Sequence, residues 1–148
     1  MDSSDEPGVA LEKIKEYMAD PEEAERFVKM TKIDSLAAAV GTIHGCKEPI
    51  AQLDIPRIEK IRDLTGVPLV LHGASGACDE EIRKGIAAGI TKINIDTRIR
   101  MAFTKAANDF LEKNPEEIDP RKMLTPAKEA AKEVIRGRIR VLGSNNKA

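Results

Sequence analysis

The residues with the clearest capacity for chemistry are the two histidines, His44 and His72, each followed by a glycine. Each histidine closes a short apolar run, in GTIHG and in PLVLHGASG. Imidazole is a good zinc ligand, and a catalytic zinc ion takes about three protein ligands and keeps one position open. Adjacent parallel strands lie about 4.8 Å apart, so imidazoles at neighbouring strand ends can reach one ion. The pattern predicts a zinc site, and the competing interpretation makes each a hydrogen-bonded core histidine.

A second metal-binding pattern adds the two cysteines, Cys46 and Cys78. With the two histidines they would form a closed structural site. Their spacings match no common zinc knuckle, which disfavours this alternative. Two cysteines are also too few for a disulfide scaffold.

A turn of small residues follows the second histidine: Gly73, Ala74, Ser75 and Gly76. Small residues let backbone N–H groups approach a ligand, and the following helix start adds partial positive charge. The Ser75 hydroxyl is a further donor. The turn therefore predicts a phosphate site, and the alternative is a plain tight turn between a strand and a helix.

The stretch KINIDT carries a third polar group. Period-two alternation places Lys92, Asn94 and Asp96 on one face of a strand and Ile93 and Ile95 on the other. If the isoleucines pack under helices, the polar face needs partners, which a polar ligand can supply. The alternatives are an exposed strand face, or an Asp96 that caps the next helix.

Guanidinium groups are candidate clamps for phosphate oxygens, because their forked donors match the geometry of that anion. The candidates in the carboxyl-terminal third are Arg98, Arg100, Arg121 and Lys122.

Three strands are expected, over 33–40, 68–73 and 91–96, and the polar residues at or just past their ends are His44, His72, and the group Asn94, Asp96 and Thr97. Expected helices lie before, between and after these strands, over 20–31, 56–66 with Gly66 as the stop, 79–89, from Thr97 onward, and over 125–143, with a weaker helical pattern over 9–18. Strands that alternate with helices predict an α/β fold with a parallel sheet. Three strands are few for a sheet covered on both faces, so the chain is expected to be part of a larger fold.

Composition narrows the class of protein. The chain has 148 residues and a net charge of −1, which argues against nucleic-acid and membrane-surface binding. No apolar run reaches the roughly 18 residues of a membrane span, and we expect a cytoplasmic protein. Residues 1–20 form a poorly defined amino-terminal segment, and residues 21–148 hold the structured domain.

Four motifs occur in one order: GTIHG, PLVLHGASG, KINIDTRIRMAFTKA and DPRKMLTPAKEA. This series resembles the carboxyl half of class II, zinc-dependent fructose-bisphosphate aldolases, from about Pro21 to Ala148. Tagatose-bisphosphate aldolases belong to the same superfamily. The resemblance implies a TIM (β/α)8 barrel whose sixth to eighth strands lie in this chain.

The resemblance also implies roles for individual residues. His44 and His72 match two of the family's three zinc ligands. The positions that match groups binding dihydroxyacetone phosphate are Gly45, Gly73, Ala74, Ser75, Asn94, Ile95, Asp96 and Thr97. Arg100 and Arg121 match arginines that reach the distal phosphate of fructose 1,6-bisphosphate. A monovalent cation, Na⁺ or K⁺, often lies beside the phosphate in this family.

The departures from the family pattern define the alternatives. The family's proton-transferring aspartate and first histidine ligand lie in a motif like H-x-D-H, which this sequence lacks. No catalytic residue is therefore assigned, and the isolated chain is expected to be inactive. The family often has an aspartate where Arg98 stands, which bears on sugar specificity. The alternatives are a tagatose-bisphosphate aldolase, or a non-catalytic half-barrel that binds phosphorylated ligands and assembles with itself or with a missing amino-terminal half.

Overall fold

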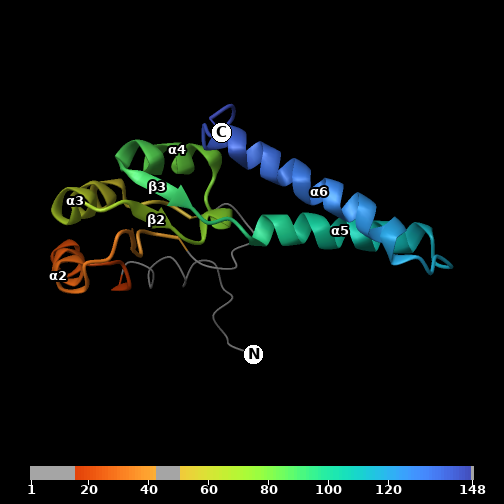
Figure 1. Cartoon of the computed structure of the whole chain (residues 1–148), viewed down its shortest axis with the longest axis horizontal. Helices are drawn as coiled ribbons and strands as arrows, with labels where there is room; N and C mark the ends of the chain where they lie inside the picture. Colours follow the sequence, from red (N-terminus) through yellow and green to blue (C-terminus); the bar gives the residue numbers. More distant parts are fainter. Residues whose placement is uncertain (1–15, 43–50, 148) are drawn as a thin grey trace. The chain divides into compact units, whose positions relative to one another are not determined.

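A computed structural model describes residues 16–42 and 51–147, and these form two compact units that divide between Asn94 and Ile95. The first unit holds three strands, β1 (Leu36–Ala37), β2 (Leu69–Leu71) and β3 (Ile90–Ile93). They form a parallel sheet in the order β1-β2-β3 (Figure 1). The expected parallel sheet is confirmed, although each strand is shorter than its apolar run suggested.

The helices of the first unit begin and end where the sequence signals them. Helix α2 (Pro21–Thr31) is capped by Asp20, whose carboxylate accepts from the Glu23 N–H at 2.9 Å. Helix α3 (Ile55–Thr65) is capped by Asp54 and ends at Gly66, which has a left-handed φ of 66°. Both helices begin in the same way: an aspartate is the N-cap, and a proline is the first or second helical residue.

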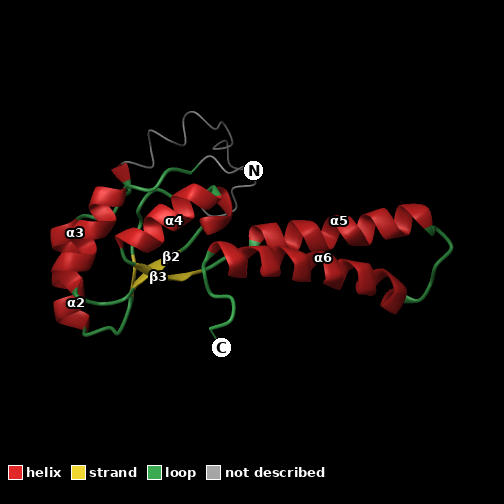
Figure 2. Ribbon diagram, turned by 90° about the horizontal axis from the view of Figure 1, so that it is seen from above, coloured by secondary structure: helices red, strands yellow, loops and turns green. Residues whose placement is uncertain are grey.

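Helix α4 (Asp79–Ala88) follows β2 and leads into β3. Its N-cap is Cys78, and Asp79 is its first helical residue. Helix α3 packs against both α2 and α4, as seen from above in Figure 2. Ile58, Ile61, Leu71 and Ile82 are almost completely buried and form the centre of this packing. In α2, Ala24 and Val28 are buried, whereas Phe27 is 51% exposed.

The second unit is a pair of packed helices, α5 (Thr97–Lys113) and α6 (Pro120–Val141). The sequence predicted that the last helix opens at Thr125 and Pro126, and this was wrong. The helix begins at Pro120, because Asp119 supplies a cap whose carboxylate accepts from the Arg121 N–H at 3.0 Å. Pro126 therefore lies inside α6, where it removes one backbone donor.

Two other expectations concern the segment over 9–18 and membrane-spanning helices. The weak helical pattern over 9–18 lies largely outside the described residues. None of the described helices is both long enough and apolar enough to cross a membrane.

Candidate functional site

The turn after β2 is the centre of the candidate site. Strand β2 is buried along its whole length, and His72 follows it directly. Gly73 then adopts a left-handed φ of 65°, a conformation that glycine reaches without strain. A short 3-10 helix, η1 (Ala74–Gly76), completes the connection. The strand thus presents His72 at its carboxyl end, and the glycine turns the chain sharply away.

This turn is tied together by its own backbone and by a neighbouring segment. The Gly76 N–H donates to the Gly73 carbonyl at 3.1 Å, and the Ala77 N–H donates to the Ala74 carbonyl at 3.2 Å. The Ala51 N–H donates to the Gly76 carbonyl at 2.8 Å, beside a parallel bridge between Ala51 and Ala77. The result is a rigid, buried turn in which Ser75 is only 5% exposed.

The start of α4 attracts a bound anion only weakly. Its first turn carries three acidic residues, Asp79, Glu80 and Glu81, which offset the helix dipole. Phosphate binding by this segment would therefore depend on the amides and hydroxyl of the turn itself.

Two of the predicted strand-end side chains meet in the first unit. The Asn94 amide nitrogen Nδ2 lies 3.3 Å from Nδ1 and 3.2 Å from Nε2 of His72. The Asn94 N–H also donates to the Leu71 carbonyl at 2.9 Å, which extends the pairing of β3 with β2 by one residue. The sequence predicted that polar residues converge at this edge of the sheet, and the His72–Asn94 pair does so.

Thr42 is a member of the site that the sequence analysis missed. Its Oγ1 donates to the His72 carbonyl at 2.6 Å and so ties the segment after β1 to the end of β2. A cavity of about 350 Å³ opens beside it, lined by Ala37, Ala38, Ala39, Thr42 and His72. The run of alanines in the sequence was the available signal, because small side chains leave room where larger ones would fill it.

The predicted face of KINIDT is not formed as expected. The register between β2 and β3 shifts after Leu69, which pairs with Ile90, whereas Val70 pairs with Lys92. Strand β3 then ends at Ile93, and Asp96 has φ −137° and ψ −61°, which is not extended. Lys92, Asn94 and Asp96 therefore do not share one strand face, because the chain turns into α5 before the alternation can continue.

The remaining predicted residues lie in the second unit. Ile95 precedes α5, Asp96 occupies its N-cap position, and Thr97 is its first residue. The Asp96 carboxylate accepts from Arg100 Nε at 2.8 Å instead of from the helix backbone.

Arg100 and Arg121, the two arginines matched to the distal phosphate, both have carboxylate partners. Arg100 pairs with Asp96 at 2.6 Å, and Arg121 pairs with Asp119 at 2.8 Å. The hydrogen bond from Arg121 lowers the pKa of the Asp119 carboxyl below its ordinary value. A phosphate that binds either arginine would compete with an existing ion pair.

Part of the metal-site prediction concerns residues outside the described ranges of the chain. His44 and Gly45, together with Cys46, lie outside the described residues. Within residues 16–42 and 51–147, no group of three or more His, Cys, Asp or Glu side chains is placed to hold a metal ion. The exposed His72 imidazole beside a cavity fits a single ligand position.

Parallel strands that end in a histidine, an asparagine and a glycine turn define an α/β protein with its candidate site at the carboxyl edge of the sheet. A family model described as class-II fructose-bisphosphate aldolase matches residues 3–147. The chain belongs to the class II fructose-bisphosphate aldolase family, a family of lyases that is generally metal-dependent.

Individual relatives agree with this family. The chain is 47% identical over 130 residues to a fructose-bisphosphate aldolase from Geobacillus stearothermophilus, covering 88% of this chain and 45% of that protein. It resembles the crystal structure of the YdjI aldolase from Escherichia coli K12, with a TM-score of 0.73 and 36% identity, over 88% of this chain and 46% of the other.

A structure of a putative fructose-1,6-bisphosphate aldolase from Coccidioides immitis gives a TM-score of 0.76 at 28% identity, over 88% of this chain and 45% of that chain. The chain therefore spans about 45% of the length of the relatives it matches. The predicted fold class is confirmed as part of a TIM (β/α)8 barrel.

Proposed function

We propose that this chain is the carboxyl-terminal part of a zinc-dependent class II aldolase. The whole protein would cleave fructose 1,6-bisphosphate reversibly into dihydroxyacetone phosphate and glyceraldehyde 3-phosphate in the cytoplasm. The observation that supports this most is the His72–Asn94 pair beside a glycine turn, in a chain of this family. Residues 21–148 would form the barrel segment, and residues 1–20 would precede it.

In this proposal His72 and His44 are two protein ligands of the metal. A divalent ion held by imidazoles supplies Lewis acidity to a bound ketone. The Asn94 amide nitrogen lies within 3.3 Å of both His72 ring nitrogens, and with the amide turned over its oxygen would accept the ring N–H that a ligating histidine leaves free. The Thr42 hydroxyl fixes the His72 backbone from the other side. Asn94 thus contacts the imidazole ring, and Thr42 fixes the backbone that carries it.

The remaining assignments concern the substrate. The amides of Gly45, Gly73 and Ala74, the Ser75 hydroxyl, and the segment from Asn94 to Thr97 would bind the dihydroxyacetone phosphate moiety, with Na⁺ or K⁺ beside it. Arg100 and Arg121 would bind the distal phosphate after leaving their present carboxylate partners. No aspartate of this chain is assigned the proton transfer, so the isolated chain would be inactive.

Metal analysis of single variants tests the ligand assignment. Zinc affinity of the chain is measured by competition with a chromophoric chelator for wild type, His72→Ala and His44→Ala. We expect both variants to lose zinc binding, and Asn94→Ala to weaken it by about 10-fold or more. Unchanged zinc affinity in His72→Ala would refute the assignment. Cys46→Ser and Cys78→Ser are the matched controls, because a loss there would instead support the closed site of two histidines and two cysteines.

The non-catalytic alternative starts from the edges of the described sheet. Three strands leave β1 and β3 as edges within the described sheet. A second copy or a separate amino-terminal half would cover such edges. Native mass measurement with an aldolase assay separates the cases. A stable monomer would exclude self-assembly, and full cleavage activity of the chain alone would exclude the half-barrel alternative. Tagatose 1,6-bisphosphate in the same assay reports sugar specificity.

A further inference from the structure

The end of α6 is closed by its own backbone. The Ser144 N–H donates to the Ile139 carbonyl at 3.0 Å, and the Gly143 N–H donates to the Arg140 carbonyl at 3.1 Å. Gly143 has a left-handed φ of 68°. This pair of bonds around a left-handed glycine is a Schellman motif, which satisfies carbonyls that a helix end otherwise leaves open.

The arginines of this turn are therefore not needed as helix caps. A basic side chain near a helix end commonly binds the last carbonyls, and here the backbone does so. Within the part of the chain that the structure describes, Arg140 makes no ion pair or side-chain hydrogen bond. Arg136 donates to the Glu133 carboxylate at 2.6 Å through Nη1, which uses one of its five N–H donors.

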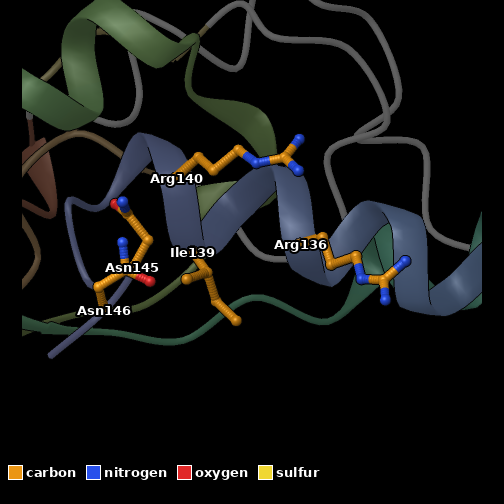
Figure 3. A pocket seen from close by; sticks show the side chains of 5 residues that line it. All are labelled: Arg136, Ile139, Arg140, Asn145 and Asn146. Atoms are coloured by element: carbon orange, nitrogen blue, oxygen red, sulfur yellow. The ribbon is translucent and has the colours of Figure 1, made fainter. Parts of the chain in front are cut away.

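The Schellman turn brings the tail back beside these arginines. A pocket of about 500 Å³ results, lined by Arg136, Ile139, Arg140, Asn145 and Asn146. Figure 3 shows Arg136 and Arg140 projecting from successive turns of α6, with Asn145 and Asn146 on the tail that follows. Asn146 has a left-handed φ of 59°, which keeps the tail folded at this point. The described lining thus offers two guanidinium groups and two amides, and it includes no acidic side chain.

We propose that this pocket binds a phosphate group, with Arg140 as its main ligand. A guanidinium fork matches the oxygens of a tetrahedral oxyanion. Figure 3 shows the Arg140 guanidinium directed away from Asn145 and Asn146, so their amides would donate to the same phosphate after Arg140 changes its rotamer. Arg136 lies one helical turn away and adds a second positive charge. None of the residues that resemble the aldolase site lines this pocket, so the proposal does not depend on the proposed function.

A nuclear magnetic resonance titration of the full chain with inorganic phosphate tests this. Ionic strength is held constant with chloride, and the side-chain amide signals of Asn145 and Asn146 are followed. These signals distinguish this pocket from the turn at Gly73–Gly76. We expect saturable shifts in wild type and a roughly 10-fold weaker affinity in Arg140→Gln, as for the loss of one charge-assisted contact.

Arg138→Gln is the matched control, because it removes the same charge from the same helical turn without lining the pocket. Its phosphate affinity should stay within about twofold of wild type. Equal weakening in the two variants, or no saturable shift in wild type, would overturn the proposal. If Arg140→Gln fails to fold, Arg140→Lys keeps the charge without the fork and should still bind more weakly than wild type. Affinity equal to wild type in that variant would also refute the role of Arg140.

Discussion

Replacement of Glu81 by alanine is the perturbation whose effect follows most directly from the structure. The Glu81 carboxylate, on α4, accepts a hydrogen bond from the Leu53 N–H at 2.9 Å. Its other oxygen accepts from Lys84 at 3.0 Å, and the side chain is only 16% exposed. Leu53 itself is 7% exposed and packs close to Gly85. One carboxylate thus fastens the segment before α3 to α4.

The expected magnitude comes from the backbone donor that would be left without a partner. Glu81→Ala deprives the buried Leu53 N–H of its acceptor, which costs about 1–3 kcal/mol of unfolding free energy. Glu81→Gln keeps an acceptor oxygen, so we expect a loss below about 1 kcal/mol. Glu80→Gln is the control, because Glu80 also pairs with Lys84 but is 75% exposed, and its loss should lie within about 0.5 kcal/mol.

Urea denaturation at neutral pH measures these differences, and amide hydrogen exchange at Leu53 locates them. The Leu53 N–H lowers the pKa of Glu81 below its ordinary value. A lowered carboxyl pKa gives stability that is complete above the ordinary value and is lost as the pH falls through the folded-state value. The gap between wild type and Glu81→Ala should therefore narrow in acid. A Glu81→Ala loss no larger than that of Glu80→Gln would refute the reasoning.

Three further substitutions test the backbone. Gly41→Ala should lower the urea midpoint more than Gly66→Ala does. A Cβ at Gly41 (φ +112°) would overlap the Gln52 carbonyl, whereas a Cβ at Gly66 (φ +66°) would have no atom within 4 Å. Equal shifts of the two midpoints would contradict this. Asp54→Ala should cost about 1 kcal/mol in the same assay through loss of the α3 cap, and Asp54→Asn should restore most of it. Pro126→Ala should raise the helical circular dichroism signal and the melting temperature, since it restores a backbone donor inside α6. An unchanged or lower melting temperature would show that Pro126 does not destabilise the helix.

Local signals made most of the first unit predictable. The cap at Asp20, the stop at Gly66 and the turn at Gly73–Gly76 each depend on residues within one turn of chain, so the sequence alone indicated them. The last helix was misplaced because Asp119–Pro120 and Thr125–Pro126 are both plausible starts. Only the unbroken helix across Pro126 shows which start is used.

In the candidate site too, the sequence determined some features and the tertiary structure determined others. Residue types and order alone identified His72, Asn94 and the Gly73–Gly76 turn as chemically significant, and they carried the resemblance to the aldolase family. Tertiary structure decided that the Asn94 amide faces the His72 ring, that Thr42 holds the His72 carbonyl, and that Glu81 reaches Leu53. It also decided that β3 stops before Asp96. The reason is physical: caps and turns are set by neighbours in the chain, whereas these contacts join segments 22 to 30 residues apart, whose separation no local pattern encodes.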